Sequence, residues 1–133
     1  MVLLSATSCK KRELSGEAHT LIGTWQWVGT GGEFTDLDPD NTGTSKTLEF
    51  TENGKYALII DSKKKESGHI TVGEPDPSIP QNHVMLKFVR NDRFSKKQEF
   101  PGNCIIWFGG RDTITIRGNR ETSHQDYHMY VRR

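Results

Sequence analysis

Acidic side chains gather in the segment GGEFTDLDPDNTGTS, residues 31–45, and they are the first candidates for chemistry. Asp36, Asp38 and Asp40 place carboxylates at alternate positions, and carboxylate and amide oxygens are the ligands that calcium requires. The spacing does not follow the EF-hand pattern, and the acidic residue expected at the end of such a loop is missing. The sequence therefore favours a role for this loop other than binding calcium.

Histidine, cysteine and serine supply no stronger candidate for a reactive site. His124 and His128 lie four residues apart, which on a strand separates them by roughly 13 Å, too far to share one metal ion. The chain has no Gly-X-Ser-X-Gly elbow, no cysteine in an electropositive motif and no glycine-rich phosphate loop before a helix. We expect no metal, no cofactor and no enzymatic activity, although an enzyme that uses acids and bases brought together only by the fold stays open.

The two cysteines have different surroundings. Cys104 lies in the apolar run NCIIWFGG, which predicts a small buried side chain. Cys9 follows a short apolar run and the small residues Ala6, Thr7 and Ser8, and basic residues come after it. This arrangement resembles the lipobox of bacterial lipoproteins, a resemblance that implies lipidation of Cys9 and a flexible tether after it. A disulfide between the two cysteines and an ordinary thiol in a cytoplasmic tail are the alternatives.

Length and composition indicate one all-β domain. The 133 residues are enough for a core without disulfides or metals, and the 13 glycines and a hydrophobic fraction of 32% suit short strands joined by many turns. The formal net charge of +1 gives no electrostatic footprint for nucleic acid. No stretch reaches the roughly 18 consecutive apolar residues of a membrane-spanning helix, so we expect membrane contact only through a lipid anchor.

Turn signals divide the chain into short strands. Asn53-Gly54 between two alternating runs predicts a type I′ hairpin, and a short helical turn is expected near residues 16–20. The predicted strands cover residues 21–30, 45–51, 55–61, 64–73, 82–90, 98–108, 111–118 and 123–132.

Eight consecutive antiparallel strands favour closure into an up-and-down barrel, which removes both sheet edges, and a β-sandwich is the rival. Alternation predicts which side chains face inward. The inward set comprises Trp25, Trp27, Leu48, Phe50, Tyr56, Leu58, Ile60, Ile70, Val72, Val84, Leu86, Phe88, Ile114, Ile116, Tyr127, Met129 and Val131.

A Gly-X-Trp motif opens the first strand at Gly23-Thr24-Trp25. Together with the strand pattern, it resembles the lipocalins, and residues 19–133 resemble the short lipocalin-like domains of bacterial lipoproteins, with residues 1–18 as signal remnant and tether. The resemblance implies an eight-stranded antiparallel lipocalin-like barrel, with a basic residue from its end packed over Trp25. Arg133 is the first choice for that residue and Arg132 the second. It also implies a protein lipid-anchored in the bacterial cell envelope, or a cytoplasmic one if Cys9 is not lipidated.

Connections at the end of the barrel away from Trp25 carry much of the positive charge. We expect a basic mouth, with the loop of residues 31–45 as a lid whose Phe34 or Leu37 dips into the barrel. Such a barrel suits a small hydrophobic or amphiphilic molecule with an anionic head, although solvated loops are also commonly charged. The basic residues of these connections are Lys63, Lys64, Lys65, Arg90, Arg93, Lys96, Lys97, Arg117 and Arg120. The predicted ligand-binding residues are Trp27, Phe34, Leu37, Tyr56, Leu58, Phe88, Met129, Lys64, Arg93 and Arg120.

A second set of apolar residues is expected on the outer face of the strands. A contiguous outer band would mark a partner surface or self-association. The alternative function is therefore a non-enzymatic protein-interaction or inhibitor module whose barrel is filled by its own side chains. The outward set comprises Ala57, Ile59, Met85, Val89, Ile106 and Phe108.

Overall fold

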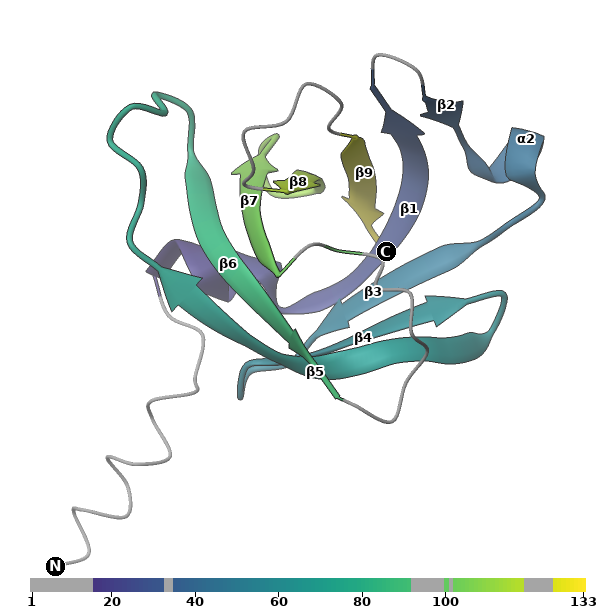
Figure 1. The fold of residues 1–133 in the computed structure, drawn as a ribbon, viewed down its shortest axis with the longest axis horizontal. Helices are drawn as coiled ribbons and strands as arrows, with labels where there is room; N and C mark the ends of the chain where they lie inside the picture. The colour runs from purple at the N-terminus through teal and green to yellow at the C-terminus, as the bar shows by residue number, and fades with distance from the viewer. Residues whose placement is uncertain (1–15, 33–34, 92–99, 101, 119–125) are drawn as a thin grey trace, which may run out of the picture.

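The computed structural model describes residues 16–32, 35–91, 100, 102–118 and 126–133. Within them, the strands form one antiparallel sheet that closes into a barrel (Figure 1). The strands are β1 (Gly23–Gly31), β2 (Asp36–Leu37), β3 (Lys46–Phe50), β4 (Lys55–Ile60), β5 (Lys63–Gly73), β6 (His83–Arg90), β7 (Asn103–Phe108), β8 (Thr113–Gly118) and β9 (Tyr127–Arg132). From β3 to β9 each strand pairs with the next, and β1 closes the ring by pairing with both β3 and β9. The predicted eight-stranded antiparallel up-and-down barrel is confirmed, with the two-residue β2 as an addition beside β1.

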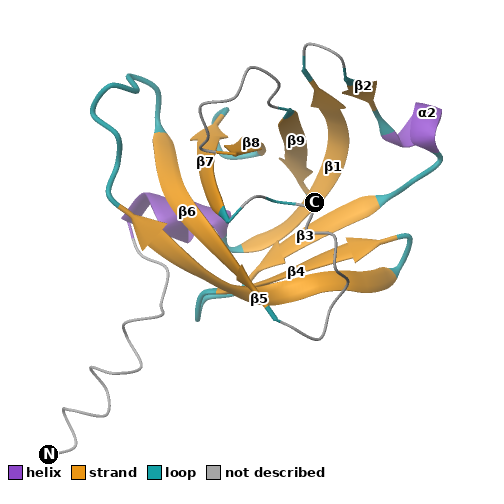
Figure 2. Cartoon of the chain, viewed as in Figure 1, coloured by secondary structure: helices purple, strands orange, loops and turns teal. Residues whose placement is uncertain are grey.

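Two short helical elements flank the sheet (Figure 2). The 3-10 helix η1 (Gly16–Leu21) confirms the predicted helical turn, and its Ala18 and Leu21 are buried in the core. The helix α2 (Pro39–Thr42) lies in the loop that suggested calcium. Asp38 caps it, because the Asp38 carboxylate accepts a hydrogen bond from the Asn41 backbone N–H at 2.7 Å. Among the described residues, no helix combines the length and the apolar character needed to cross a membrane.

The tightest hairpin joins β4 to β5, where Asp61 and Ser62 have φ values of 50° and 68°. Two central residues with positive φ form a type I′ turn, so this turn type occurs here and not at the predicted Asn53-Gly54. At that position only Gly54 has positive φ, 77°. The hairpin between β3 and β4 closes instead through Thr51, whose N–H donates to the Lys55 carbonyl at 3.0 Å. The predicted hairpin is present, but its loop is one residue longer than a type I′ turn allows.

Alternation predicted the interior correctly on most strands. A continuous core links strands all around the barrel and includes η1. The buried members of the predicted inward set are Trp25, Trp27, Leu48, Phe50, Tyr56, Leu58, Ile70, Val84, Leu86, Phe88, Ile114 and Ile116.

Two strands have the opposite phase from the one predicted. On β9, Tyr130 is 1% exposed, whereas Met129 is 39% exposed and Tyr127 also lies outside. On β7, Ile106 is buried in the core and Phe108 packs against it, although both were expected outside. Both faces of β7 are apolar, so hydropathy does not distinguish them.

Val72 is a further departure, because it lies near the end of β5 and is exposed.

Candidate functional site

The end of the barrel at which β1 begins, called the floor here, is closed by Trp25 and Arg132. The Arg132 Cζ atom lies 4.3 Å from the centroid of the Trp25 ring. The Arg132 guanidinium donates from Nη1 to the Ile22 carbonyl at 3.0 Å and from Nη2 to the Thr20 carbonyl at 2.6 Å. The Trp25 indole N–H donates to the Leu21 carbonyl at 2.8 Å. These contacts tie the last strand, the first strand and η1 into one unit, so the Gly-X-Trp motif has a structural role.

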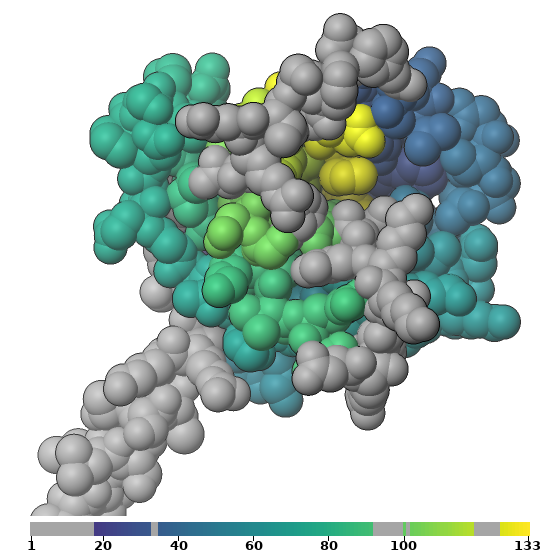
Figure 3. All heavy atoms as spheres, viewed as in Figure 1, coloured from purple at the N-terminus to yellow at the C-terminus, as the bar shows by residue number. Residues whose placement is uncertain are grey.

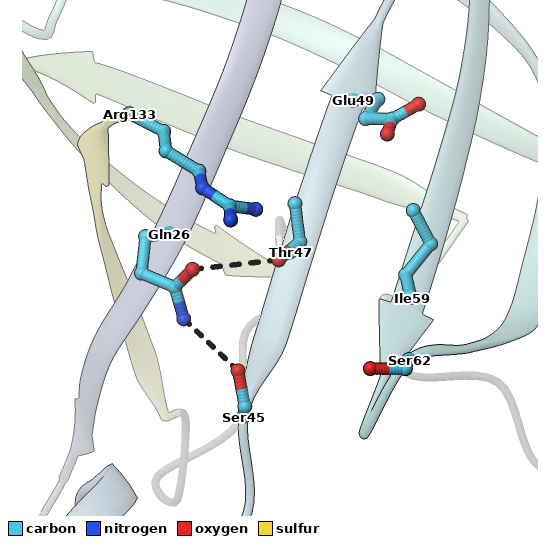
Figure 4. A pocket seen from close by; sticks show the side chains of 7 residues that line it. All are labelled: Gln26, Ser45, Thr47, Glu49, Ile59, Ser62 and Arg133. Atoms are coloured by element: carbon cyan, nitrogen blue, oxygen red, sulfur yellow. Dashed lines mark hydrogen bonds between the residues drawn. The ribbon is translucent and has the colours of Figure 1, made fainter.

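The floor arginine is Arg132, the second choice, and the prediction of Arg133 is wrong. The reason is strand register: Trp25 lies directly opposite Arg132 on β9, and residues directly opposite share a face. The floor also favours glycine at position 23. A Cβ atom there would lie 3.0 Å from Arg132 Nη1, and the φ of Gly23 is 133°, a value that other residues rarely adopt. Arg133 lies beyond the strand, with its side chain on the outer face of the barrel (Figure 4).

At the opposite end, called the mouth, polar groups enter the barrel. Trp27 Nε1 donates to the Thr30 hydroxyl at 2.9 Å, and this hydroxyl also lies 2.9 Å from His128 Nδ1. The Lys46 ammonium lies 4.6 Å from the centroid of the Trp27 ring, in a cation–π contact. We name this set of residues, together with Phe100, the mouth cluster; its members are Trp27, Thr30, Lys46, His128 and Phe100.

Phe100 links the other members of the mouth cluster to the core. It is fully buried, stacks on Phe88 with ring centroids 4.8 Å apart, and meets His128 edge-on at 5.9 Å. A cavity large enough for a ligand would leave accessible surface on the rings around it, yet Trp27, Phe88 and Phe100 have almost none. In this conformation the barrel's own aromatic side chains therefore occupy the predicted ligand space.

A carboxylate lies inside the barrel as well. Glu66 on β5 is 2% exposed, and its Oε2 accepts a hydrogen bond from the Tyr56 hydroxyl at 2.7 Å. Burial, together with this hydrogen bond, raises the pKa of Tyr56 far above its usual range. Burial, with a smaller contribution from the Glu66 charge, raises the pKa of the Cys104 thiol to about 12. At neutral pH the interior thus holds a neutral phenol and a neutral thiol.

The structure brings together four of the predicted ligand-binding residues in the barrel interior, and these are Trp27, Tyr56, Leu58 and Phe88. Met129 lies on the outer face, contrary to the prediction. Leu37 is 44% exposed and belongs to β2, which pairs with the end of β1, so it does not dip into the barrel. Lys64 is exposed near the mouth, as expected of a rim residue. Phe34, Arg93, Arg120 and Cys9 lie outside the described residues.

Several polar and aromatic interior residues were not predicted from the sequence. Glu66 belongs to the charged run KKKES, which is typical of a solvated turn. Phe100 stands directly before Pro101-Gly102, where a turn signal interrupts the predicted strand. The available signal was alternation: Phe100, Cys104 and Ile106 have the same parity, and all three are buried.

No protein-family model and no curated protein matches the chain. Among solved structures, the chain is similar to a designed protein described as "De novo design of a fluorescence-activating beta barrel". The two are 10% identical, the TM-score is 0.45, and the match covers 90% of this chain and 99% of that chain. The assignment of a closed antiparallel barrel rests on the strand pairing described above.

Proposed function

We propose that the chain is a non-enzymatic binding barrel that takes a small hydrophobic or amphiphilic molecule through its mouth. The observation that carries the proposal is that polar groups at the mouth, Lys46, Glu66 and His128, contact aromatic rings of an apolar interior. Burying a polar group lowers the stability of the folded state unless the group is hydrogen-bonded. A few polar groups in an apolar pocket are, however, typical of sites that orient a ligand.

The apolar part of the ligand takes the place of Phe100 in this proposal. Phe100 lies against Phe88 and Tyr130, so its departure uncovers an apolar space that leads from the mouth into the core. Each ligand methylene buried there contributes about 0.8 kcal/mol, from which the cost of displacing Phe100 is subtracted. An anionic head would remain near Lys46 and the exposed lysines at the start of β5.

In this proposal the interior residues bind the ligand and do not react with it. A reactive cysteine needs a lowered pKa, and the pKa of Cys104 is raised to about 12 by burial. The thiol of Cys104 therefore acts as a small apolar side chain in the core.

An NMR titration with fatty acids of increasing length tests the proposal. Shifts should appear at interior residues of β6, β7 and β9, and affinity should rise with chain length until the space is full. Phe100→Ala should bind the fatty acids more tightly than the wild type, because no side chain has to be displaced. Phe108→Ala is the matched control, since Phe108 packs against the core from the far end of β7. Shifts confined to outer faces, or no shifts at millimolar ligand in the wild type and Phe100→Ala, would contradict the proposal.

The second candidate is a protein-interaction module with a filled barrel, including self-association. Two observations favour it: the interior rings are packed, and apolar side chains are exposed on β1, β2 and β9. Of these side chains, Tyr127 and Met129 lie two residues apart on β9 and therefore share the outer face of the sheet. Figure 3 shows the atoms of β9, in yellow, beside the blue atoms of β2 and its neighbours. Sedimentation of the wild type and of Met129→Lys over a range of concentrations tests this candidate.

We also propose, from the residues around Cys9, that the protein is a lipid-anchored envelope lipoprotein with a lipocalin-like barrel. The support is the order of small residues, cysteine and a polar segment before the barrel. If Cys9 carries no lipid, a cytoplasmic location is the alternative.

A further inference from the structure

A shallow groove lies on the outer face of the barrel, separate from the interior. Its volume is about 200 Å³, and its lining residues come from β1, β3 and the residue before it, β4, the β4–β5 turn and the residue after β9 (Figure 4). The side chains are outward because their neighbours Trp25, Trp27, Leu48 and Leu58 are buried in the core. The lining residues are Gln26, Ser45, Thr47, Glu49, Ile59, Ser62 and Arg133.

Two consecutive hydrogen bonds fix the orientation of the polar side chains at the centre of the groove. The Thr47 hydroxyl donates to Gln26 Oε1 at 3.4 Å, and Gln26 Nε2 donates to the Ser45 hydroxyl oxygen at 3.3 Å. Because the Ser45 hydroxyl accepts in this chain, its own proton is left to be donated to a ligand. The second proton on Gln26 Nε2 is left in the same way. The groove therefore presents donors beside Arg133.

The groove is lined by one positively charged residue, Arg133, and one negatively charged residue, Glu49. The Arg133 backbone N–H is anchored by a hydrogen bond to the Thr24 carbonyl at 2.9 Å, and its guanidinium extends over β1 toward Thr47 (Figure 4). Glu49 follows Thr47 by two residues on the same face of β3, roughly 7 Å further along the strand. In the part of the chain that the structure describes, neither the Arg133 guanidinium nor the Glu49 carboxylate makes a hydrogen bond or an ion pair.

We propose that this groove binds a small zwitterion, a molecule that carries a carboxylate and an ammonium group, such as a free amino acid. The carboxylate would lie on the planar fork of Arg133 and the Ser45 hydroxyl, and the ammonium on Glu49. A guanidinium matches a carboxylate with two parallel hydrogen bonds, and Glu49 has only acceptors to offer. Ile59 supplies the one apolar wall, against which a short carbon chain packs. The volume is below the roughly 300 Å³ at which pockets for drug-sized ligands begin, so the groove suits a small metabolite.

Amide chemical shifts in an NMR titration test this inference. The probes are glycine, β-alanine and γ-aminobutyrate, which differ in the spacing of their charges, with acetate and ethylammonium as single-charge probes. We expect shifts at Gln26, Thr47 and Ile59, and tighter binding of one of the zwitterions than of either single-charge probe. An exposed ion pair contributes little, so Glu49→Gln and Arg133→Gln should each weaken that zwitterion about twofold to fivefold.

Matched control variants distinguish binding in the groove from binding to surface charges elsewhere. Glu52→Gln and Arg111→Gln remove exposed charges of the same kinds that do not line the groove, and both should leave the affinity unchanged. Glu49→Gln should leave the affinity for acetate unchanged. The inference is overturned if no shifts occur at these amides at tens of millimolar probe, if single-charge probes bind as tightly as every zwitterion, or if Glu49→Gln has no larger effect than Glu52→Gln. These outcomes do not depend on whether the barrel interior binds a ligand.

Discussion

Replacing Arg132 by methionine removes the guanidinium from the floor of the barrel and keeps most of the aliphatic stem. Three charge-assisted hydrogen bonds are lost, to the carbonyls of Thr20, Ile22 and Arg111, and such bonds contribute about 1.5 to 3 kcal/mol each, with the exposed one to Arg111 at the low end. The contact with the face of the buried Trp25 ring adds about 0.5 to 2 kcal/mol. The ion pair with Asp112 adds little, because its atoms are 3.7 Å apart and the Asp112 side chain is 82% exposed. These contributions share partners and do not add fully, so we expect Arg132→Met to lower the free energy of unfolding by about 3 to 5 kcal/mol.

The adjacent arginine is the control for this experiment. Arg133→Met removes the same charge one residue further along, where the guanidinium lies on the outer face, and should change stability by less than about 0.5 kcal/mol. Urea unfolding measures both variants, and an unchanged m-value shows that the midpoints can be compared. A loss below about 1 kcal/mol for Arg132→Met, or an equal loss for both variants, would refute the assignment of Arg132 as the residue that closes the floor.

Three further predictions concern other parts of the chain. Burial raises the pKa of the Cys104 thiol from 9.0 to about 12, so the folded state keeps a proton that the unfolded state loses. Cys104 alone should therefore lower the stability by about 1.4 kcal/mol per pH unit between about pH 9 and pH 12, and Tyr56, whose pKa is also raised, should add to the fall above about pH 10. Urea unfolding across this range should show a shallower fall for Cys104→Ala. Gly23→Ala should lower the urea midpoint by an amount equivalent to about 1 to 3 kcal/mol because of its φ of 133° and the nearby Arg132 guanidinium, whereas Gly31→Ala, with open space around it, should not. Expressed with its upstream codons in a bacterial host, the protein should fractionate with membranes, and Cys9→Ser should release it; equal solubility of both would contradict lipidation.

Much of the fold could be predicted because strand pairing follows local rules. Apolar alternation identified the strands around the barrel, and short connections made sequence neighbours into antiparallel neighbours. The Gly-X-Trp motif located the floor, and the tryptophans two residues apart share the interior face as expected. Turn type was less predictable: Asp61-Ser62 forms the type I′ turn, although Asn53-Gly54 has the stronger local preference for it.

The positions of Thr30 and Glu66 could not be predicted, because the side of the sheet on which they lie depends on bulges that hydropathy does not reveal. On β1, Val28 is an extra residue between Trp27, which is opposite Tyr130, and Gly29, which is opposite Met129. The bulge lets Trp27 and Thr30 both face inward, although they are three positions apart along the chain and regular alternation would put them on opposite faces.

A second bulge does the same on β5, where the register passes from Lys64 opposite Ile59 to Glu66 opposite Leu58 and leaves Lys65 as the extra residue. Without this bulge, alternation would place Lys64 and Glu66 on the same face, yet Lys64 is exposed and Glu66 is buried. The same run of charged residues thus supplies both the solvated rim and the buried carboxylate. Bulges near the mouth therefore turn Thr30 and Glu66 toward the interior, whereas Lys46 and His128 lie on the inner face by regular alternation with Leu48 and Tyr130.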